Sequence, residues 1–136
     1  MLKRDSSTHS GVLEHLLEKI TIKLLSILST LAIALGSIMP IPSSGGEETR
    51  ALTFNLLHFT SYIVCSFLWA HSIKSRRVYI ALMVLITPLT EILQLPLLYR
   101  SSNIADLMIN MMGVIIGYFI YGLSNIIKHT IDGARS

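Results

Sequence analysis

Between residues 87 and 117, two otherwise almost wholly apolar segments together carry two carboxylates and two carboxamides. Glu91 and Gln94 are three residues apart, and Asp106 and Asn110 are four apart. Either spacing places two side chains on one face of a helix. A carboxylate near the centre of a bilayer costs about 2.5 to 3.5 kcal/mol, so a membrane helix rarely carries one without a use for it. We therefore predict a polar site at these residues.

The types of residue indicate which chemistry this site could carry out. Three of them are candidates for general acid–base catalysis on a lipid head group: His58, Glu91 and Asp106. A guanidinium binds two oxygens at once, so Arg100 is suited to holding an external anion such as a phosphate. We assign four residues to substrate binding: Tyr62, Gln94, Arg100 and Asn110.

Each of these residues also has a structural role open to it. Asp106 lies near the start of its predicted helix. A carboxylate there is stabilised by the unpaired backbone amides and by the positive end of the helix dipole. Gln94 and Asn110 are able to hydrogen-bond between helices, which is worth about 0.6 to 2 kcal/mol. Gly113 and Gly117 have the spacing of a small-residue pair, which predicts close helix packing rather than chemistry.

The order and spacing of these residues resemble those of the VanZ-like membrane proteins, a family named for a teicoplanin-resistance protein. The resemblance covers about residues 50 to 120. Many members carry Asp-Lys just before a His-Phe pair, where this chain has Phe54 and Asn55, so a role for that lysine does not carry over. The matching residues are Glu91-Ile-Leu-Gln94, Arg100, Asp106-Leu-Met-Ile-Asn110-Met-Met-Gly113 and Gly117, with His58-Phe59 and Tyr62 upstream.

The resemblance implies a helical, membrane-spanning fold. It also implies a contribution to tolerance of lipoglycopeptide antibiotics or to envelope homeostasis, by acting on or binding a lipid-linked or cell-wall component. Two other classes of function stay open beside it. One is a membrane enzyme that uses acid–base chemistry on a lipid head group. The other is a structural or accessory membrane subunit, whose polar residues only determine helix packing.

The composition independently indicates an integral membrane protein. Of the 136 residues, 51% are hydrophobic and 14% are charged, against about 25% charged in an ordinary soluble domain. Three apolar segments are long enough to cross a hydrocarbon core of about 30 Å, and the first, whose uncharged run continues to Gly46, is long enough to cross most of it. We predict an all-α fold, an integral membrane four-helix bundle with a short N-terminal amphipathic helix. The spans are placed at about residues 24–39, 51–73, 78–99 and 104–127.

We divide the chain into three parts. Residues 1–21 form a cytoplasmic leader whose apolar residues recur at helical spacing, which predicts an amphipathic helix on the membrane surface or one that binds a partner. Residues 22–128 form the four-helix membrane domain, and residues 129–136 form a cytoplasmic tail. A cleaved signal peptide at the first span is disfavoured, because the long leader before it contains acidic residues.

The distribution of basic residues predicts the orientation. Of the 11 Lys and Arg residues, all but Arg50 and Arg100 lie in the termini or in the link after the second span. By the positive-inside rule, both termini face the cytoplasm of what we expect to be a bacterial plasma membrane. Trp69 and Tyr79 then belong to the aromatic belt at the inner interface.

The same orientation places the predicted site in the outer half of the membrane. At 1.5 Å per residue, three spans deliver polar groups to a layer about 8 to 12 Å below the outer boundary. We therefore predict one outward-facing site, whose shared layer contains His58, Glu91, Gln94 and Asn110.

Other classes of function lack their usual motifs. The one cysteine, Cys65, excludes an intrachain disulfide and a CxxC metal or redox site, and we expect no metal and no cofactor. No nucleotide-binding, zinc-protease or serine-hydrolase motif is present. We expect no nucleic-acid partner despite the net charge of +3, and instead a membrane lipid or a lipid-linked envelope component. A transporter is disfavoured, since the four spans show no inverted repeat.

Overall fold

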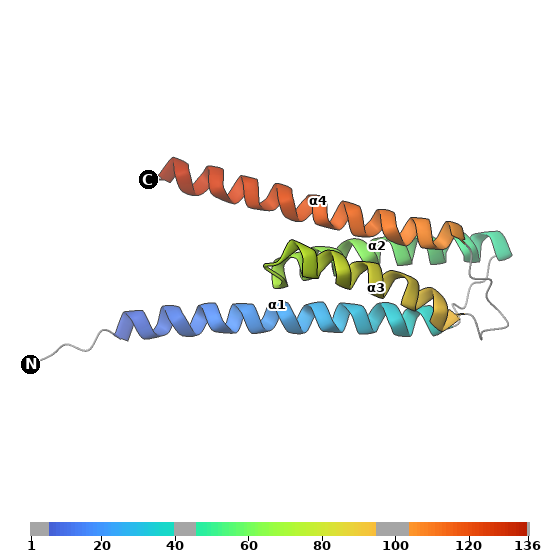
Figure 1. The fold of residues 1–136 in the computed structure, drawn as a ribbon, viewed down its shortest axis with the longest axis horizontal. Helices are drawn as coiled ribbons and strands as arrows, with labels where there is room; N and C mark the ends of the chain where they lie inside the picture. Colours follow the sequence, from blue (N-terminus) through green and yellow to red (C-terminus); the bar gives the residue numbers. More distant parts are fainter. Residues whose placement is uncertain (1–5, 40–45, 95–103, 136) are drawn as a thin grey trace, which may run out of the picture.

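The computed structural model describes residues 6–39, 46–94 and 104–135, and these residues form four helices. The helices run alternately in opposite directions, so that the ends of α1 and α3 lie at one end of the molecule (Figure 1). Each helix is long and apolar enough to cross a membrane. The prediction of an all-α membrane bundle is confirmed. The bounds are α1 Ser6–Ile38, α2 Glu47–Ser72, α3 Arg76–Gln94 and α4 Ile104–Arg135.

Large apolar side chains cover the outside of the bundle, and many of the buried side chains are small or polar. Leu85 and Ile115, for example, are each 63% exposed, whereas Ser26 and Ser66 are fully buried. A membrane gives helices no hydrophobic drive to associate, because lipid tails are as apolar as leucine. Close packing and interhelical hydrogen bonds hold such helices together instead. This surface is therefore suited to contact with lipid.

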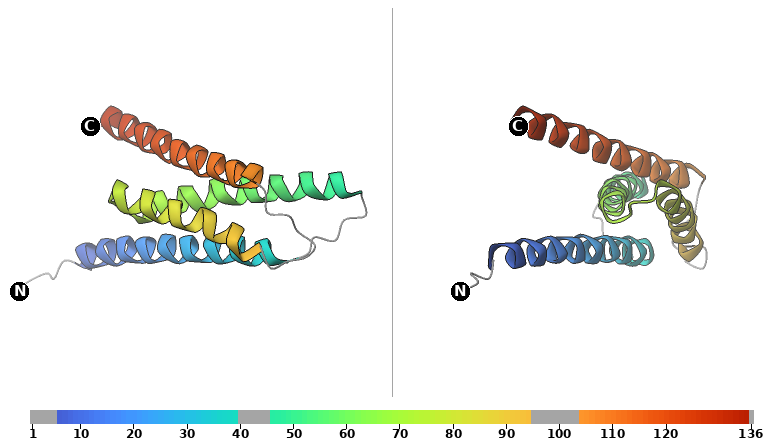
Figure 2. Two further views of the ribbon diagram at one scale, coloured as in Figure 1. Left: turned by 45° about the vertical axis from the view of Figure 1, so that its right-hand side comes forward. Right: turned by 60° about the vertical axis from the view of Figure 1, so that its left-hand side comes forward.

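The helix α2 occupies the centre of the bundle. It contacts α1, α3 and α4, and its packing against α4 is the most extensive. Within the described residues α1 and α4 do not contact each other, and Figure 2 shows them on opposite sides of α2. The middle of α2 therefore carries side chains that face three different neighbours.

Two glycines allow α4 to approach α2 closely. A Cβ atom on Gly113 would lie 2.8 Å from the carbonyl oxygen of Phe59 and 2.9 Å from the Cβ of Tyr62. A Cβ atom on Gly117 would lie 2.8 Å from the Cβ of Ser66 and would also overlap a backbone carbonyl. Both positions therefore exclude any larger residue unless the helices move apart.

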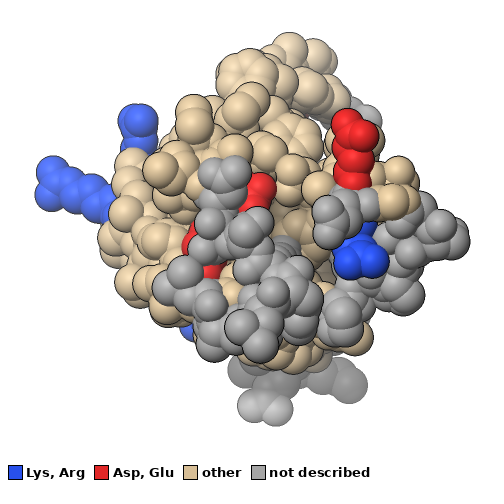
Figure 3. All heavy atoms as spheres, turned by 90° about the vertical axis from the view of Figure 1, so that its right-hand side faces the viewer, with Lys and Arg blue, Asp and Glu red and all other residues tan. Residues whose placement is uncertain are grey.

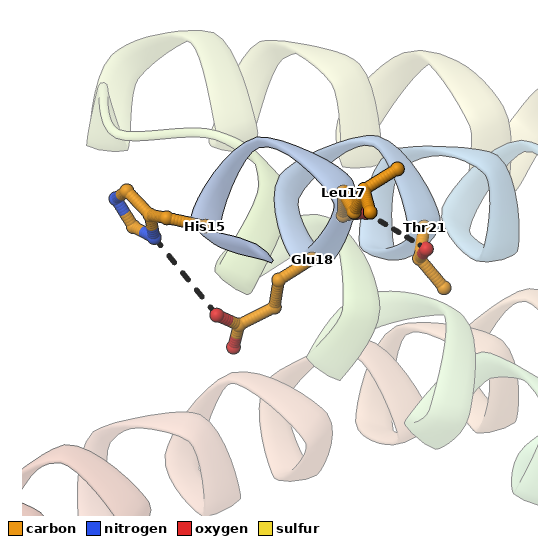
Figure 4. A network of polar contacts seen from close by, with 4 residues as sticks. All are labelled: His15, Leu17, Glu18 and Thr21. Carbon is orange, nitrogen blue, oxygen red and sulfur yellow. Dashed lines mark hydrogen bonds and ion pairs between the residues drawn. The ribbon is translucent and has the colours of Figure 1, made fainter. Parts of the chain in front are cut away.

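The leader and the first span form one continuous helix. No proline interrupts the sequence between the amphipathic part and the apolar part, so α1 runs unbroken from Ser6 to Ile38. On the leader part, the exposed side chains of His15 and Glu18 approach to 3.9 Å (Figure 4).

The ends of two other helices also differ from the predicted spans or go beyond what is described. The helix α4 continues to Arg135, past the predicted end of the fourth span. The third helix is described as far as Gln94, and the rest of its predicted span lies outside the described residues.

The half of the bundle away from the predicted site is held by a second group of polar contacts. Tyr79 is only 4% exposed, and its hydroxyl lies 2.7 Å from that of Ser66. Trp69 donates its indole N–H to the hydroxyl of Thr30 at 2.9 Å. We expected Trp69 and Tyr79 to face lipid head groups, but both direct their polar atoms into the protein. The hydrogen bonds to Ser66 and Thr30, which belong to neighbouring helices, satisfy these polar atoms. Neither side chain therefore has to reach the membrane interface.

Candidate functional site

Buried polar side chains gather toward the end of the molecule where α1 and α3 terminate. The last turn of α1 contributes one of them, the middle of α2 contributes one, the second half of α3 contributes three, and the second turn of α4 contributes one. In Figure 3, which views the molecule from this end, acidic side chains are visible near the middle of the face. The buried residues of this polar layer are Ser37, His58, Thr87, Thr90, Gln94 and Asn110.

The imidazole of His58 connects α2 to α1. It is 6% exposed, and its Nε2 lies 3.0 Å from the hydroxyl oxygen of Ser37. That hydroxyl donates its own proton to the carbonyl of Ile33 at 2.8 Å. Since a hydroxyl has one proton, it accepts from His58, and this assigns the Nε2–H form of the ring. The ring of Phe54, one turn earlier on α2, packs against the imidazole, with ring centroids 3.9 Å apart.

The phenol of Tyr62 connects α2 to α3. Tyr62 is fully buried, and its hydroxyl is hydrogen-bonded to that of Thr90. Thr90 donates to the carbonyl of Thr87 at 2.8 Å, so Tyr62 is the donor of the bond to Thr90. The rings of His58 and Tyr62 lie on the same face of α2, with centroids 6.3 Å apart.

The carboxylate of Glu91 connects α3 to α4. The side-chain amide of Asn110 donates to its Oε1 at 2.7 Å. The structure therefore brings the polar faces of these two neighbouring segments together, as their spacing predicts. Asp106 is half-buried in the first turn of α4, one turn before Asn110, where a carboxylate is favoured by the helix dipole.

The carboxamide of Gln94 differs from the other groups in the layer. It is 1% exposed, and neither its nitrogen nor its oxygen has a hydrogen-bond partner within the described residues. Gln94 follows Glu91 by one turn and so lies on the same face of α3. An unpaired buried amide of this kind costs about 1 to 3 kcal/mol. Arg100, the residue predicted to hold phosphate, lies outside the described residues.

Three hydrogen bonds of this layer join three different pairs of helices: α1 with α2, α2 with α3, and α3 with α4. Two of the six bonded residues, Ser37 and Thr90, are ones whose importance the sequence did not reveal. The spacing of Thr87 and Thr90 relative to Glu91 and Gln94 would have placed them on the same helical face. No comparable signal marks Ser37, because its partner His58 belongs to another helix.

The layer also limits the chemistry that the site offers. It presents a carboxylate, an imidazole, a phenol and two carboxamides, all from described residues. In the described part of the chain, no group of three His, Cys, Asp or Glu side chains is placed to hold a metal ion. Proton transfer and hydrogen bonding are the two kinds of chemistry that these side chains themselves supply.

Comparison with known proteins finds a family match. The sequence model of the VanZ/LLP1 family matches residues 5–125, a range that includes every predicted site residue. No curated protein and no solved structure matches the chain.

Proposed function

The chain belongs to the VanZ/LLP1 family, and on this basis we propose that it binds the polar head group of a lipid-linked envelope component at the layer around Glu91, Gln94 and Asn110. The family match confirms the resemblance that the sequence motifs indicated. Through this binding, the protein contributes to tolerance of lipoglycopeptides such as teicoplanin or to envelope homeostasis.

The observation that carries the proposal is the buried carboxamide of Gln94. His58, Tyr62 and Asn110 each bond to a neighbouring helix, and so each has a structural use. Gln94 has no such bond within the described residues. A buried polar group that no protein atom pairs is a candidate ligand contact, because binding then satisfies it.

The chemistry of the layer indicates which head groups it suits. A carboxamide donates and accepts, and the neighbouring carboxylate accepts, so together they match the hydroxyl and amide groups of a sugar or peptide. Arg100 would hold the phosphate that links such a head group to its lipid. The apolar exterior of the helices keeps the lipid tails of the same ligand in the membrane.

Replacing Gln94 with leucine separates a binding role from a structural one. Leucine has a similar volume and no polar atoms, so we expect the unfolding temperature of the empty protein to stay the same or rise. Native mass spectrometry of the gently purified wild-type protein should show a bound lipid with the mass of a lipid-linked saccharide or peptide. The Gln94→Leu variant should lack this lipid.

The control is Leu93→Ala, a change at an exposed apolar neighbour that should leave the bound lipid unchanged. A wild-type protein without an envelope lipid would contradict the proposal. So would a Gln94→Leu variant that retains the lipid. A lower unfolding temperature for Gln94→Leu would identify the carboxamide as a packing residue and favour the accessory role.

An outward-facing site also requires the orientation that the basic residues predict, with both termini in the cytoplasm of a bacterial plasma membrane. Glu48 and Ser75 are exposed at opposite ends of the bundle. In a Cys65→Ser background, a cysteine at Glu48 should react with an impermeant thiol reagent in intact cells, and one at Ser75 should react only after lysis. The opposite labelling pattern would place the polar layer on the cytoplasmic side.

A further inference from the structure

A groove lies between the first half of α3 and residues 111–118 of α4, beside the polar layer but lined by none of its residues. Its volume is about 230 Å³, and it opens to the outside of the bundle. Its walls are apolar. The main wall residues are Ile80, Met83 and Val84 from α3, and Met111, Ile115 and Tyr118 from α4.

One end of this groove is basic. Arg76, the first residue of α3, lines the groove together with Tyr79, whose ring stacks on that of Tyr118 at 4.9 Å. Lys74 and Arg77 flank Arg76 in the sequence, and all three are exposed. The positive end of the α3 dipole adds to this charge. From Arg76 to Val84 the α3 wall rises about 12 Å, which spans much of one leaflet.

We propose that the groove binds an anionic glycerophospholipid, with one acyl chain between α3 and α4 and its phosphate at Arg76. An apolar groove that opens into a bilayer meets lipid tails, and a guanidinium at its end selects among lipids by head-group charge. Under the proposed orientation, this end faces the cytoplasmic leaflet, where anionic lipids attract basic residues. The groove is a second site, separate from the polar layer.

The test is a lipid titration of the full-length purified protein followed by native mass spectrometry. The probes are phosphatidylglycerol and phosphatidylcholine with identical acyl chains. We expect phosphatidylglycerol to bind more tightly, and Arg76→Gln to weaken it about tenfold, since it loses a charged contact. Arg77 is exposed but does not line the groove, so Arg77→Gln should weaken binding less than about twofold in physiological salt.

A second pair of variants tests the groove itself. Val84→Trp fills it and should weaken phosphatidylglycerol binding about tenfold. Val78→Trp, at an equally exposed position outside the groove, should have no effect. If Val84→Trp lowers the unfolding temperature, Ile80→Trp replaces it at another exposed wall position.

Equal affinity for the two lipids, equal effects of the two arginine variants, or equal effects of the two tryptophan variants would each overturn the proposal. Gln94→Leu should leave phosphatidylglycerol binding unchanged. The two lipids also differ in mass from a lipid-linked saccharide or peptide. A negative result for phospholipid binding in the groove is therefore distinguishable from a negative result for binding of an envelope component at the polar layer.

Discussion

Replacing Gly117 with alanine should destabilise the bundle by about 1 to 3 kcal/mol. The added Cβ would meet the Cβ of Ser66 at 2.8 Å and the backbone carbonyl of Ile63. A backbone carbonyl inside a helix cannot move away alone, so α4 must shift from α2. That shift also strains the 2.6 Å bond from the Ser66 hydroxyl to the carbonyl of Val114. Unfolding of the purified protein in mixed detergents, followed by circular dichroism, measures the loss.

The control for this prediction lies on the same helix. A Cβ on Gly122 would meet nothing within 4 Å. Gly122→Ala should therefore be neutral or stabilise the protein, by up to about 1 kcal/mol from helix propensity. Equal stability of the Gly117 and Gly122 variants would show that α2 and α4 do not pack as closely as this structure places them.

Replacing Glu91 with glutamine should abolish the proposed contribution to teicoplanin tolerance while the protein still accumulates in the membrane. Glutamine keeps the Oε1 atom that accepts the 2.7 Å bond from Asn110, so the free energy of unfolding should change by less than about 0.5 kcal/mol. What the variant loses is the negative charge and the proton-accepting group. Growth inhibition by teicoplanin, normalised to the amount of protein in the membrane, measures the effect.

Two further variants separate charge from packing. Asn110→Leu removes the donor to Glu91 and should cost about 1 to 3 kcal/mol. Glu91→Leu should lose both stability and tolerance, because it removes the same bond together with the charge. Normal tolerance in the Glu91→Gln variant would exclude acid–base chemistry at this residue and support the accessory role.

The sequence alone predicted the class of the protein and the number of its membrane spans, but it predicted the amphipathic leader as a separate helix, which the structure joins to the first span. Each span is a long apolar run with at most one charged residue, and a bilayer requires such a run to form a helix because only a helix satisfies its own backbone there. Spacing within the segments also predicted that Glu91 and Asn110 lie on faces that meet. Their helices are neighbours because a short link joins them.

Only the tertiary structure decided which groups pair across helices that are distant in the sequence. The bond from His58 to Ser37 and that from Tyr62 to Thr90 depend on α2 lying at the centre of the bundle. The tertiary structure also directs the hydroxyl of Tyr79 inward to Ser66 and leaves the carboxamide of Gln94 without a hydrogen-bond partner in the described residues. Periodicity indicates which face of a helix is polar or small, but not which helix that face meets. In a membrane that choice depends on close packing and hydrogen bonds between helices, which no single segment contains.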